Sequence, residues 1–147
     1  MRIERSIKVN APRSAVWEYV TDPGNYLEFM EGLTRWAVEG KPARGLGARY
    51  RVLIRVGSAD VGGLVEVVEW SPEGDMAWSS VTGVDQRGRW RLREASDGRT
   101  DISFRFAYGV AGGGITGLLA ERVAAIPLGL RFKRSLENVK RELEGGA

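Results

Sequence analysis

The chain has 147 residues, enough for one domain with a hydrophobic core, and its net charge is +3. It contains neither cysteine nor histidine, which excludes disulfides, Cys- or His-ligated metal sites, and Ser-His-Asp or Cys-His catalysis. Hydrophobic residues make up 43% and charged residues 28%, as in ordinary soluble globular proteins. We therefore expect a single domain over residues 1–147, without a bound metal.

The N-terminal part predicts a strand followed by two short helices. Apolar and polar residues alternate over residues 3–9, which is typical of a strand with one buried side, and Arg5 interrupts the apolar set as at a sheet edge. A proline suits the first position of the helix predicted over residues 12–21. The turn at residues 22–25 then leads to a second helix over residues 26–30.

The middle of the chain predicts further strands, separated by turns rich in Gly, Pro and Asp. These strands cover residues 33–38, 49–56, 64–70, 76–82, 87–93 and 101–108. Gly62 and Gly63 are expected to separate the strand at residues 49–56 from the strand at residues 64–70. Because consecutive strands are joined by short turns, the pattern indicates an antiparallel sheet.

A long helix is predicted from Gly112 to Glu144. One side carries Leu118, Ala125, Gly129, Phe132, Leu136, Val139 and Leu143, and up to Phe132 a second apolar side carries Leu119, Val123, Ile126 and Leu130. A helix with two apolar sides must be covered twice or must face a space that the protein does not fill. This pattern predicts a hollow, ligand-holding domain. Pro127 is expected to kink the helix, either as a gate for ligand entry or as static curvature.

The chain ends carry no sign of membrane targeting. The first residues lack the apolar core of a signal peptide. The longest apolar stretch, residues 117–130, carries Glu121 and Arg122 and is too short to span a bilayer. These features predict a cytoplasmic protein without stable membrane insertion.

Several short motifs follow one another along nearly the whole chain. They are Ala11-Pro12-x-x-x-Val16-Trp17, Asp22-Pro23 with Tyr26 closely following, Gly47-x-x-Tyr50, Trp78-x-Ser80-x-x-Gly83, Gly88-x-Trp90, Gly98-x-Thr100 and Ser135-Leu136-x-x-x-Lys140-x-x-Leu143-Glu144. In this order and spacing the chain resembles the START-like helix-grip (SRPBCC) superfamily, in its polyketide cyclase/dehydrase-like branch.

The resemblance implies an α+β helix-grip fold. A seven-stranded antiparallel sheet would curl around a long C-terminal helix, with two short helices between the first two strands and an apolar cavity between sheet and helix. Relatives bind lipids, quinones, polyketides or plant hormones, and some are aromatase/cyclases that use no cofactor. The fold does not choose among these functions.

The expected ligand-binding residues are apolar and aromatic side chains on the inner side of the sheet and on the helix. They are Tyr50, Val52, Ile54, Trp90, Phe104, Phe106 and Tyr108 from strands and Leu119, Val123 and Ile126 from the helix, with Phe29 and Trp36 near the mouth. Each of them could equally be ordinary core, because core and cavity wall use the same residue types.

Arg122 is the main polar candidate, because it sits on the apolar half of the predicted helix. It could hold a carboxylate, phosphate or enolate at the cavity, or extend to the surface and pair with Glu18 or Glu121. The hydroxyls of Tyr50 and Tyr108 could orient a ligand or lie at the rim.

Two features of the strands leave alternatives open. The strand at residues 64–70 can place either Glu66 with Trp70 or Glu69 inside, and we expect both glutamates near solvent or at the rim. A row of arginines, expected on the outer side of the sheet, could contact a phosphate or an acidic partner or could form a solvated face: Arg87, Arg89, Arg91, Arg93 and Arg105. No aromatic residues are interleaved there to stack on bases, so no nucleic-acid partner is expected.

The leading hypothesis is a carrier that binds an apolar small molecule, such as a lipid, quinone or polyketide, without a cofactor. One alternative is a cofactor-free polyketide aromatase/cyclase, in which Arg122 and a tyrosine would polarise a carbonyl. Another is a protein-interaction module that uses the outer arginines. Without histidine, and with no Asp or Glu assigned to the cavity, the sequence favours the carrier.

Overall fold

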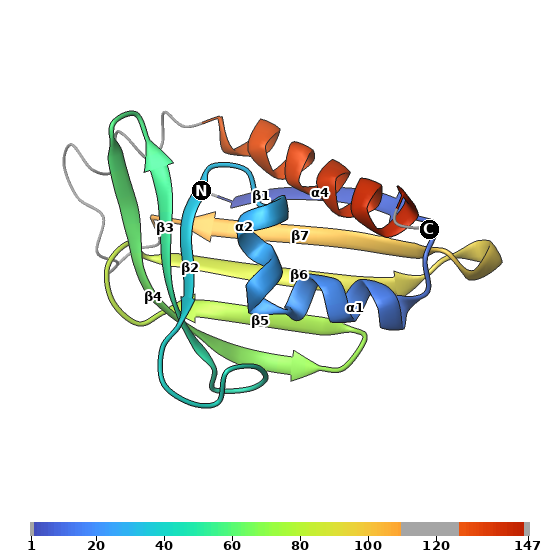
Figure 1. Cartoon of the computed structure of the whole chain (residues 1–147), viewed down its shortest axis with the longest axis horizontal. Helices are drawn as coiled ribbons and strands as arrows, with labels where there is room; N and C mark the ends of the chain where they lie inside the picture. The colour runs from blue at the N-terminus through green and yellow to red at the C-terminus, as the bar shows by residue number, and fades with distance from the viewer. Residues whose placement is uncertain (1, 110–126, 146–147) are drawn as a thin grey trace.

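The computed structural model describes residues 2–109 and 127–145 (Figure 1). Seven antiparallel strands form one sheet: β1 (Arg2–Val9), β2 (Leu33–Val38), β3 (Arg49–Val56), β4 (Ala59–Ser71), β5 (Asp75–Ser80), β6 (Gln86–Glu94) and β7 (Thr100–Tyr108). Their spatial order is β1-β7-β6-β5-β4-β3-β2, so β2 to β6 each pair with the next strand along the chain, and β7 pairs with β1. The predicted antiparallel sheet is confirmed, with β1 at an edge as Arg5 indicated.

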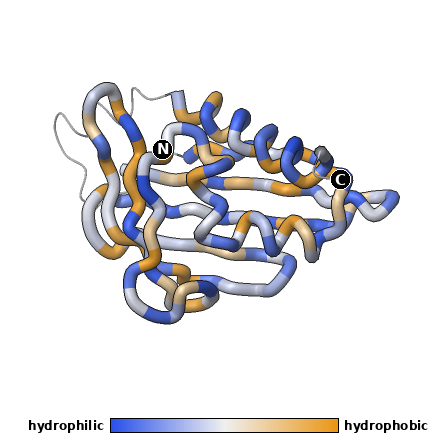
Figure 2. The backbone as a smooth tube through the Cα atoms, in the orientation of Figure 1, coloured by the Kyte–Doolittle hydropathy of each residue, from blue (hydrophilic) through white to orange (hydrophobic). Residues whose placement is uncertain are grey.

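The helices lie on one face of this curled sheet (Figure 1). Two α-helices with a single 3-10 turn between them join β1 to β2: α1 (Arg13–Thr21), η1 (Pro23–Asn25) and α2 (Tyr26–Phe29). The last helix, α4 (Leu128–Gly145), follows β7 and packs on β1, α1 and α2. Colours for apolar and polar residues alternate along the strands in Figure 2, as expected when one face of a sheet is buried. The architecture is the predicted α+β helix-grip fold.

The strand β4 is longer than predicted, because Gly62 and Gly63 lie within it instead of interrupting it. Both glycines are places of close backbone approach. A Cβ atom at Gly62 would lie 1.9 Å from the carbonyl oxygen of Val52, and one at Gly63 would lie 2.1 Å from that of Thr82. The glycines therefore let neighbouring backbone pass close to β4, and the chain stays extended through them.

A bulge in β4 decides the register that the sequence left open. Its pairing with β5 shifts between Val67 and Glu69, so that one residue is added on the β4 side. Glu66 and Glu69 both lie on the outer face, where they pair with arginines. Trp70 returns to the helix side and packs against Trp17, with ring centroids 5.0 Å apart. The expectation that both glutamates lie near solvent is confirmed.

The helix α4 begins directly after Pro127, whose carbonyl oxygen accepts a hydrogen bond from the backbone of Arg131 at 3.1 Å. Pro127 therefore lies just outside α4 and not inside it as predicted, a position that suits a residue with no N–H to donate, whereas the predicted kink stays a prediction. The predicted helical residues 112–126 lie outside the described residues. Within α4 the buried apolar side chains form one stripe, and Leu130, expected on a second apolar side, is exposed.

Candidate functional site

The candidate site is a recess between the inner face of the sheet and α4. The sheet contributes Leu33, Trp36, Val52, Ile54, Trp78, Gln86, Phe104 and Phe106, the turn after α2 contributes Met30 and Glu31, and α4 contributes Leu128, Arg131 and Phe132. The recess encloses about 430 Å³ including its opening to solvent, and about 30 Å³ of it is wide enough for the centre of a water molecule. Its walls are almost entirely aromatic and aliphatic.

Five of the predicted site residues line this recess: Trp36, Val52, Ile54, Phe104 and Phe106. Three others are packed in the core beside it, each with a defined neighbour. Phe29 packs edge-on against Trp90, the Trp90 indole donates a hydrogen bond to the Tyr26 hydroxyl at 2.9 Å, and the Tyr50 hydroxyl donates one to the carbonyl of Ala43 at 3.0 Å. Tyr108 packs against Phe106. Ligand binding by these residues stays a prediction.

The remaining predicted residues lie outside the described part of the chain: Leu119, Arg122, Val123 and Ile126. Sequence reasoning also missed several wall residues, chiefly Trp78, Gln86 and Phe132 as cavity-facing groups. The available signal for Trp78 was Gly88, a glycine inside a strand that otherwise alternates regularly.

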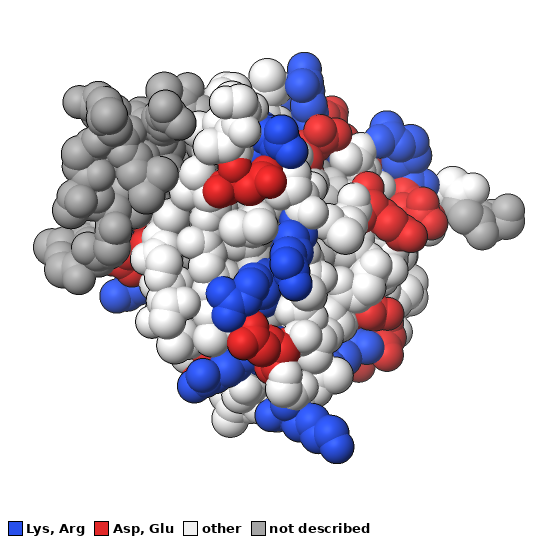
Figure 3. Space-filling model, turned by 60° about the vertical axis from the view of Figure 1, so that its left-hand side comes forward, with Lys and Arg blue, Asp and Glu red and all other residues white. Residues whose placement is uncertain are grey.

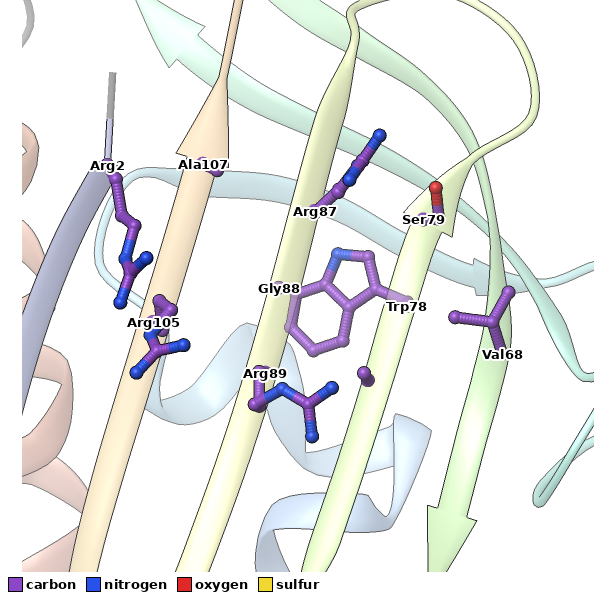
Figure 4. A pocket seen from close by; sticks show the side chains of 10 residues that line it. Arg2, Val68, Trp78, Ser79, Arg87, Gly88, Arg89, Arg105 and Ala107 are labelled. Carbon is purple, nitrogen blue, oxygen red and sulfur yellow. The ribbon is translucent and has the colours of Figure 1, made fainter. Parts of the chain in front are cut away.

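Gly88 makes room for the Trp78 side chain, which lies next to it on the neighbouring strand (Figure 4). A Cβ atom at Gly88 would lie 2.1 Å from Cζ2 of the indole, so no larger residue fits without moving the ring. The pairing of β5 with β6 therefore fixes the position of one wall of the recess.

Aromatic rings connect α2, the sheet and α4 around the recess. Tyr26 stacks on Trp36 at 4.0 Å, and Trp36 meets Trp78 edge-on at 5.3 Å. Trp78 in turn packs on Phe104 at 5.8 Å, and Phe104 meets Phe132 of α4 at 5.1 Å. Each of these rings is in contact with at least one other, so the aromatic wall is continuous from α2 to α4.

The buried tyrosines near the recess are neutral hydrogen-bonding groups. Burial raises the pKa of Tyr50 to about 12, although Arg44 opposes the shift. Burial also raises the pKa of Tyr26, and its hydrogen bond from Trp90 only partly offsets this. Neither hydroxyl is ionised near neutral pH, and each already has a partner, so neither is suited to act as a general base.

The mouth of the recess is held by polar contacts between α4 and the turn after α2. The Ser135 hydroxyl accepts a hydrogen bond from the backbone of Glu31 at 2.9 Å, and the Asn138 amide donates one to the carbonyl of Phe29 at 3.0 Å. Arg131 donates to the carbonyl of Arg55 at 2.9 Å. The two charged residues at the recess, Glu31 and Arg131, therefore both have partners within the fold.

The predicted arginine row lies on the outer face of the sheet. Asp75 accepts hydrogen bonds from Arg89 at 2.8 Å, Arg91 at 3.1 Å and Arg93 at 2.9 Å. Burial alone would raise the pKa of Asp75, but the three guanidinium groups outweigh it and hold that pKa below its usual range. On the side of the molecule that Figure 3 shows, turned by 60° from Figure 1, acidic and basic side chains likewise lie near one another. Most of the row is therefore neutralised within the protein.

A shallow depression on the outer face, of about 510 Å³, surrounds Gly88 and is bordered by arginines (Figure 4). Its basic border consists of Arg2, Arg87, Arg89 and Arg105. Arg89 and Arg105 are paired with Glu69 and Glu4, respectively. The depression is open, and its lining combines small side chains with the indole of Trp78, which also lines the recess on the inner face.

Two features of the described residues concern metal binding and membrane-spanning helices. Among residues 2–109 and 127–145, no group of three or more acidic side chains is placed to hold a metal ion. Neither α4 nor any shorter helix that the structure describes has the length and apolar character needed to cross a bilayer.

A seven-stranded sheet that grips a helix over an aromatic recess defines a helix-grip protein. The chain belongs to the family described as polyketide cyclase/dehydrase and lipid transport, whose model matches residues 1–144. No curated protein sequence matched the chain significantly.

Solved structures share this fold over nearly the whole chain. TTHA0849 from Thermus thermophilus is 17% identical, with a TM-score of 0.78 over 100% of this chain and 99% of that one. The Zhui aromatase/cyclase from Streptomyces sp. R1128 is 19% identical, with a TM-score of 0.77 over 98% and 93%. The Aha1 dimer from Colwellia psychrerythraea is 14% identical, with a TM-score of 0.62 over 99% and 98%. At these identities the likeness concerns the fold alone.

Proposed function

We propose that the protein binds an apolar small molecule between the inner face of the sheet and α4, and that it carries this ligand instead of transforming it. The observation that supports the proposal is the recess itself, whose walls are aromatic and aliphatic. The family description, which includes lipid transport, agrees with it.

The ligand must widen the recess to enter. The space of about 30 Å³ that can hold water is far smaller than the several hundred cubic ångströms of ordinary ligand pockets. Phe132 of α4 rests on Phe104 and Phe106 across the recess, with ring centroids 5.1 and 5.2 Å apart. Movement of Phe132 away from these two rings would open the space that a lipid-sized molecule needs.

The choice of a carrier over a catalyst rests on the polar groups of the described wall. Glu31 is the one carboxylate that the described residues place there, and it accepts a hydrogen bond from Asn138 at the mouth. The hydroxyls of Tyr26 and Tyr50 already take part in hydrogen bonds. A base or acid free to act on a ligand is therefore lacking among the described residues of the recess.

Ligand titration tests the proposal. The purified, delipidated protein should bind an environment-sensitive apolar dye or a C12–C18 fatty acid at about one site, with a dissociation constant near ~1 μM, or about −8 kcal/mol. The Val52→Phe variant fills the recess and should weaken binding at least about tenfold, which is about 1.4 kcal/mol. The control is Val68→Phe, since Val68 is exposed on the outer face and its replacement should leave binding unchanged.

The outcome that would contradict the proposal is the absence of any change in dye emission or tryptophan fluorescence across these ligands. The alternative of a polyketide aromatase/cyclase is distinguished by native mass spectrometry after incubation with a poly-ketone. A carrier returns the ligand at its original mass, whereas cyclisation with aromatisation releases water and lowers that mass.

A further inference from the structure

Two buried indole groups in the recess lack a hydrogen-bond acceptor. Trp36 and Trp78 are 7% and 3% exposed, both line the recess, and neither Nε1 atom has a partner. A buried N–H group without an acceptor costs free energy relative to one in water, so native proteins rarely keep such groups without a reason.

The chain satisfies a comparable group elsewhere. Trp90, also fully buried, donates its indole N–H to the Tyr26 hydroxyl at 2.9 Å. Trp90 does not contribute to the wall of the recess, whereas Trp36 and Trp78 do. Among the described residues, the buried indoles left without an acceptor are therefore the ones on the ligand-facing wall.

Both rings are held in place before any ligand arrives. Trp36 is stacked on Tyr26 and also packs against Tyr50, with centroids 5.2 Å apart. Trp78 occupies the space left by Gly88 and meets Trp36 edge-on at 5.3 Å. Donors that are already oriented lose little conformational entropy when they bind an acceptor.

We infer that Trp36 and Trp78 act as a pair of hydrogen-bond donors that selects, among apolar ligands, those with an uncharged acceptor oxygen such as a ketone, quinone or ester carbonyl. This inference rests on the proposed function, since it names the ligand class for the same recess. An indole nitrogen donates and does not accept, so its partner on the ligand must be an acceptor. Both Nε1 atoms are shielded in the free protein, so a ligand oxygen reaches them when the recess widens, as it must for any ligand.

The preferred charge of the ligand depends on where the recess holds its cationic side chain. Arg131 lies at the mouth, where it is bonded to the carbonyl of Arg55. A carboxylate that stays at the mouth can pair with Arg131, whereas one buried beside the two indoles would lose its hydration and meet only uncharged donors there, which is unfavourable. Gln86, which is buried in the same wall, can donate a further hydrogen bond to a second oxygen of an uncharged ligand.

Two ligands with the same ring skeleton test the inference: menadione carries two carbonyl groups, and 2-methylnaphthalene carries none. Menadione should bind about tenfold more tightly than 2-methylnaphthalene, which corresponds to about one hydrogen bond. Trp36→Phe and Trp78→Phe should each reduce this preference to about threefold or less; the ratio of the two affinities is the readout, because a change in wall packing affects both ligands alike. The control is Trp70→Phe, because Trp70 packs against Trp17 away from the recess and should keep the full preference.

Nitrogen-15 NMR of the indole groups gives a second readout that needs no variant to fold. Menadione should shift the Nε1–H signals of Trp36 and Trp78 downfield, while 2-methylnaphthalene and 2-naphthoate should not. The Trp90 signal, already bonded to Tyr26, should stay in place with each compound.

The possible results separate the inference from the function on which it rests. Equal binding of menadione and 2-methylnaphthalene, with unmoved indole signals, would overturn the inference and leave the proposed function standing. Signals that are already downfield in the free protein and stay so with menadione would mean that internal water satisfies both donors, which also overturns it. An equal response to 2-naphthoate would overturn the preference for uncharged ligands. Failure of every compound to bind would overturn the proposed function itself.

Discussion

Gly88 and Trp78 determine the shape of one wall of the recess. The glycine leaves a space of about one side chain on β6, and the indole from β5 occupies it. Substitution by alanine would place a Cβ atom 2.1 Å from Cζ2 of the ring, a distance that the packed core cannot accept without moving Trp78. This single pair therefore links the stability of the sheet to the geometry of the candidate site.

We expect Gly88→Ala to lower the free energy of unfolding by about 1–3 kcal/mol, because overpacking forces the indole from its position. Chemical denaturation measures this loss, and near-UV circular dichroism should report the movement of the tryptophan. The matched control is Gly129→Ala, where the added methyl group meets only the end of the long Arg5 side chain and alanine favours the helix. Equal stability of Gly88→Ala and the native protein would contradict this account.

Single wall residues were predictable from the sequence where one face of a strand is polar. Val52 and Ile54 of β3 lie between two arginines at positions 51 and 55, and Phe104 and Phe106 of β7 are separated by Arg105, which marks their side of the sheet. The first four residues of β5, in contrast, are buried on both faces, because Asp75 and Ala77 lie beneath the outer arginines. With no polar face for comparison, the pattern gave no orientation for Trp78.

At the scale of elements, α4 has two parts. Its start forms a wall of the recess, and its middle is packed in the core. Leu136 is buried in its middle, whereas Phe132, one turn earlier, faces Phe104 and Phe106 across the recess. The two parts of the helix should therefore respond differently when side chains that they contact are removed.

We expect Phe106→Ala to destabilise the ligand-free protein no more than Leu136→Ala, although it removes more carbon. A packed leucine replaced by alanine costs about 2–5 kcal/mol. A side chain on a cavity wall already lacks contacts on one side, so its loss should cost only about 1–2 kcal/mol. Phe106→Ala should also weaken or broaden ligand selection, and Leu136→Ala should not.

Denaturant titration of the two variants without ligand, followed by binding of the apolar dye, measures both effects. A much larger loss of stability for Phe106→Ala, together with unchanged binding, would mean that Phe106 belongs to the packed core. The recess would then not be the ligand site.

Most elements were predicted from their periodicity to within one or two residues, but two local features were not. The bulge between Val67 and Glu69 adds a residue to one strand only, and no pattern of period two can contain it. The start of α4 at Leu128 is the other, because the periodicity placed Pro127 inside a longer helix. The bulge depends on pairing with another strand, which a single sequence does not display.

Across the whole molecule, the outer face of the sheet depends on ionised carboxylates. The hydrogen bond from Arg105 lowers the pKa of Glu4, and that from Arg89 lowers the pKa of Glu69. Asp75 also has a lowered pKa, because its three arginine partners outweigh the effect of its burial. A carboxyl group with a lower pKa in the folded state stabilises the protein above its unfolded pKa of about 4, and this contribution is lost as the pH falls through the folded value.

We expect Asp75→Asn to lower the free energy of unfolding near neutral pH by about 1–3 kcal/mol, because three guanidinium groups lose a charged partner. The difference from the native protein should begin to shrink as the pH falls below about 4, where the carboxyl of the unfolded chain becomes protonated, and should be lost once the pH passes the lowered pKa of Asp75 in the folded protein. Denaturant titrations across this pH range measure the difference. The control is Glu66→Gln, which removes a single exposed ion pair with Arg49 and should cost less than about 1 kcal/mol. A difference for Asp75→Asn that does not change with pH would contradict the assignment.

The position of α4 after all seven strands has a consequence for synthesis of the chain. During translation the apolar inner face of the sheet is complete before its covering helix has left the ribosome. The contacts that join the first strand to this helix include the backbone of Asn10 with Glu144 at 2.7 Å and Lys140 with the carbonyl of Lys8 at 3.1 Å. Because these partners are more than 130 residues apart, the unit closes only after α4 has been made, and the nascent sheet must be kept from other chains until then.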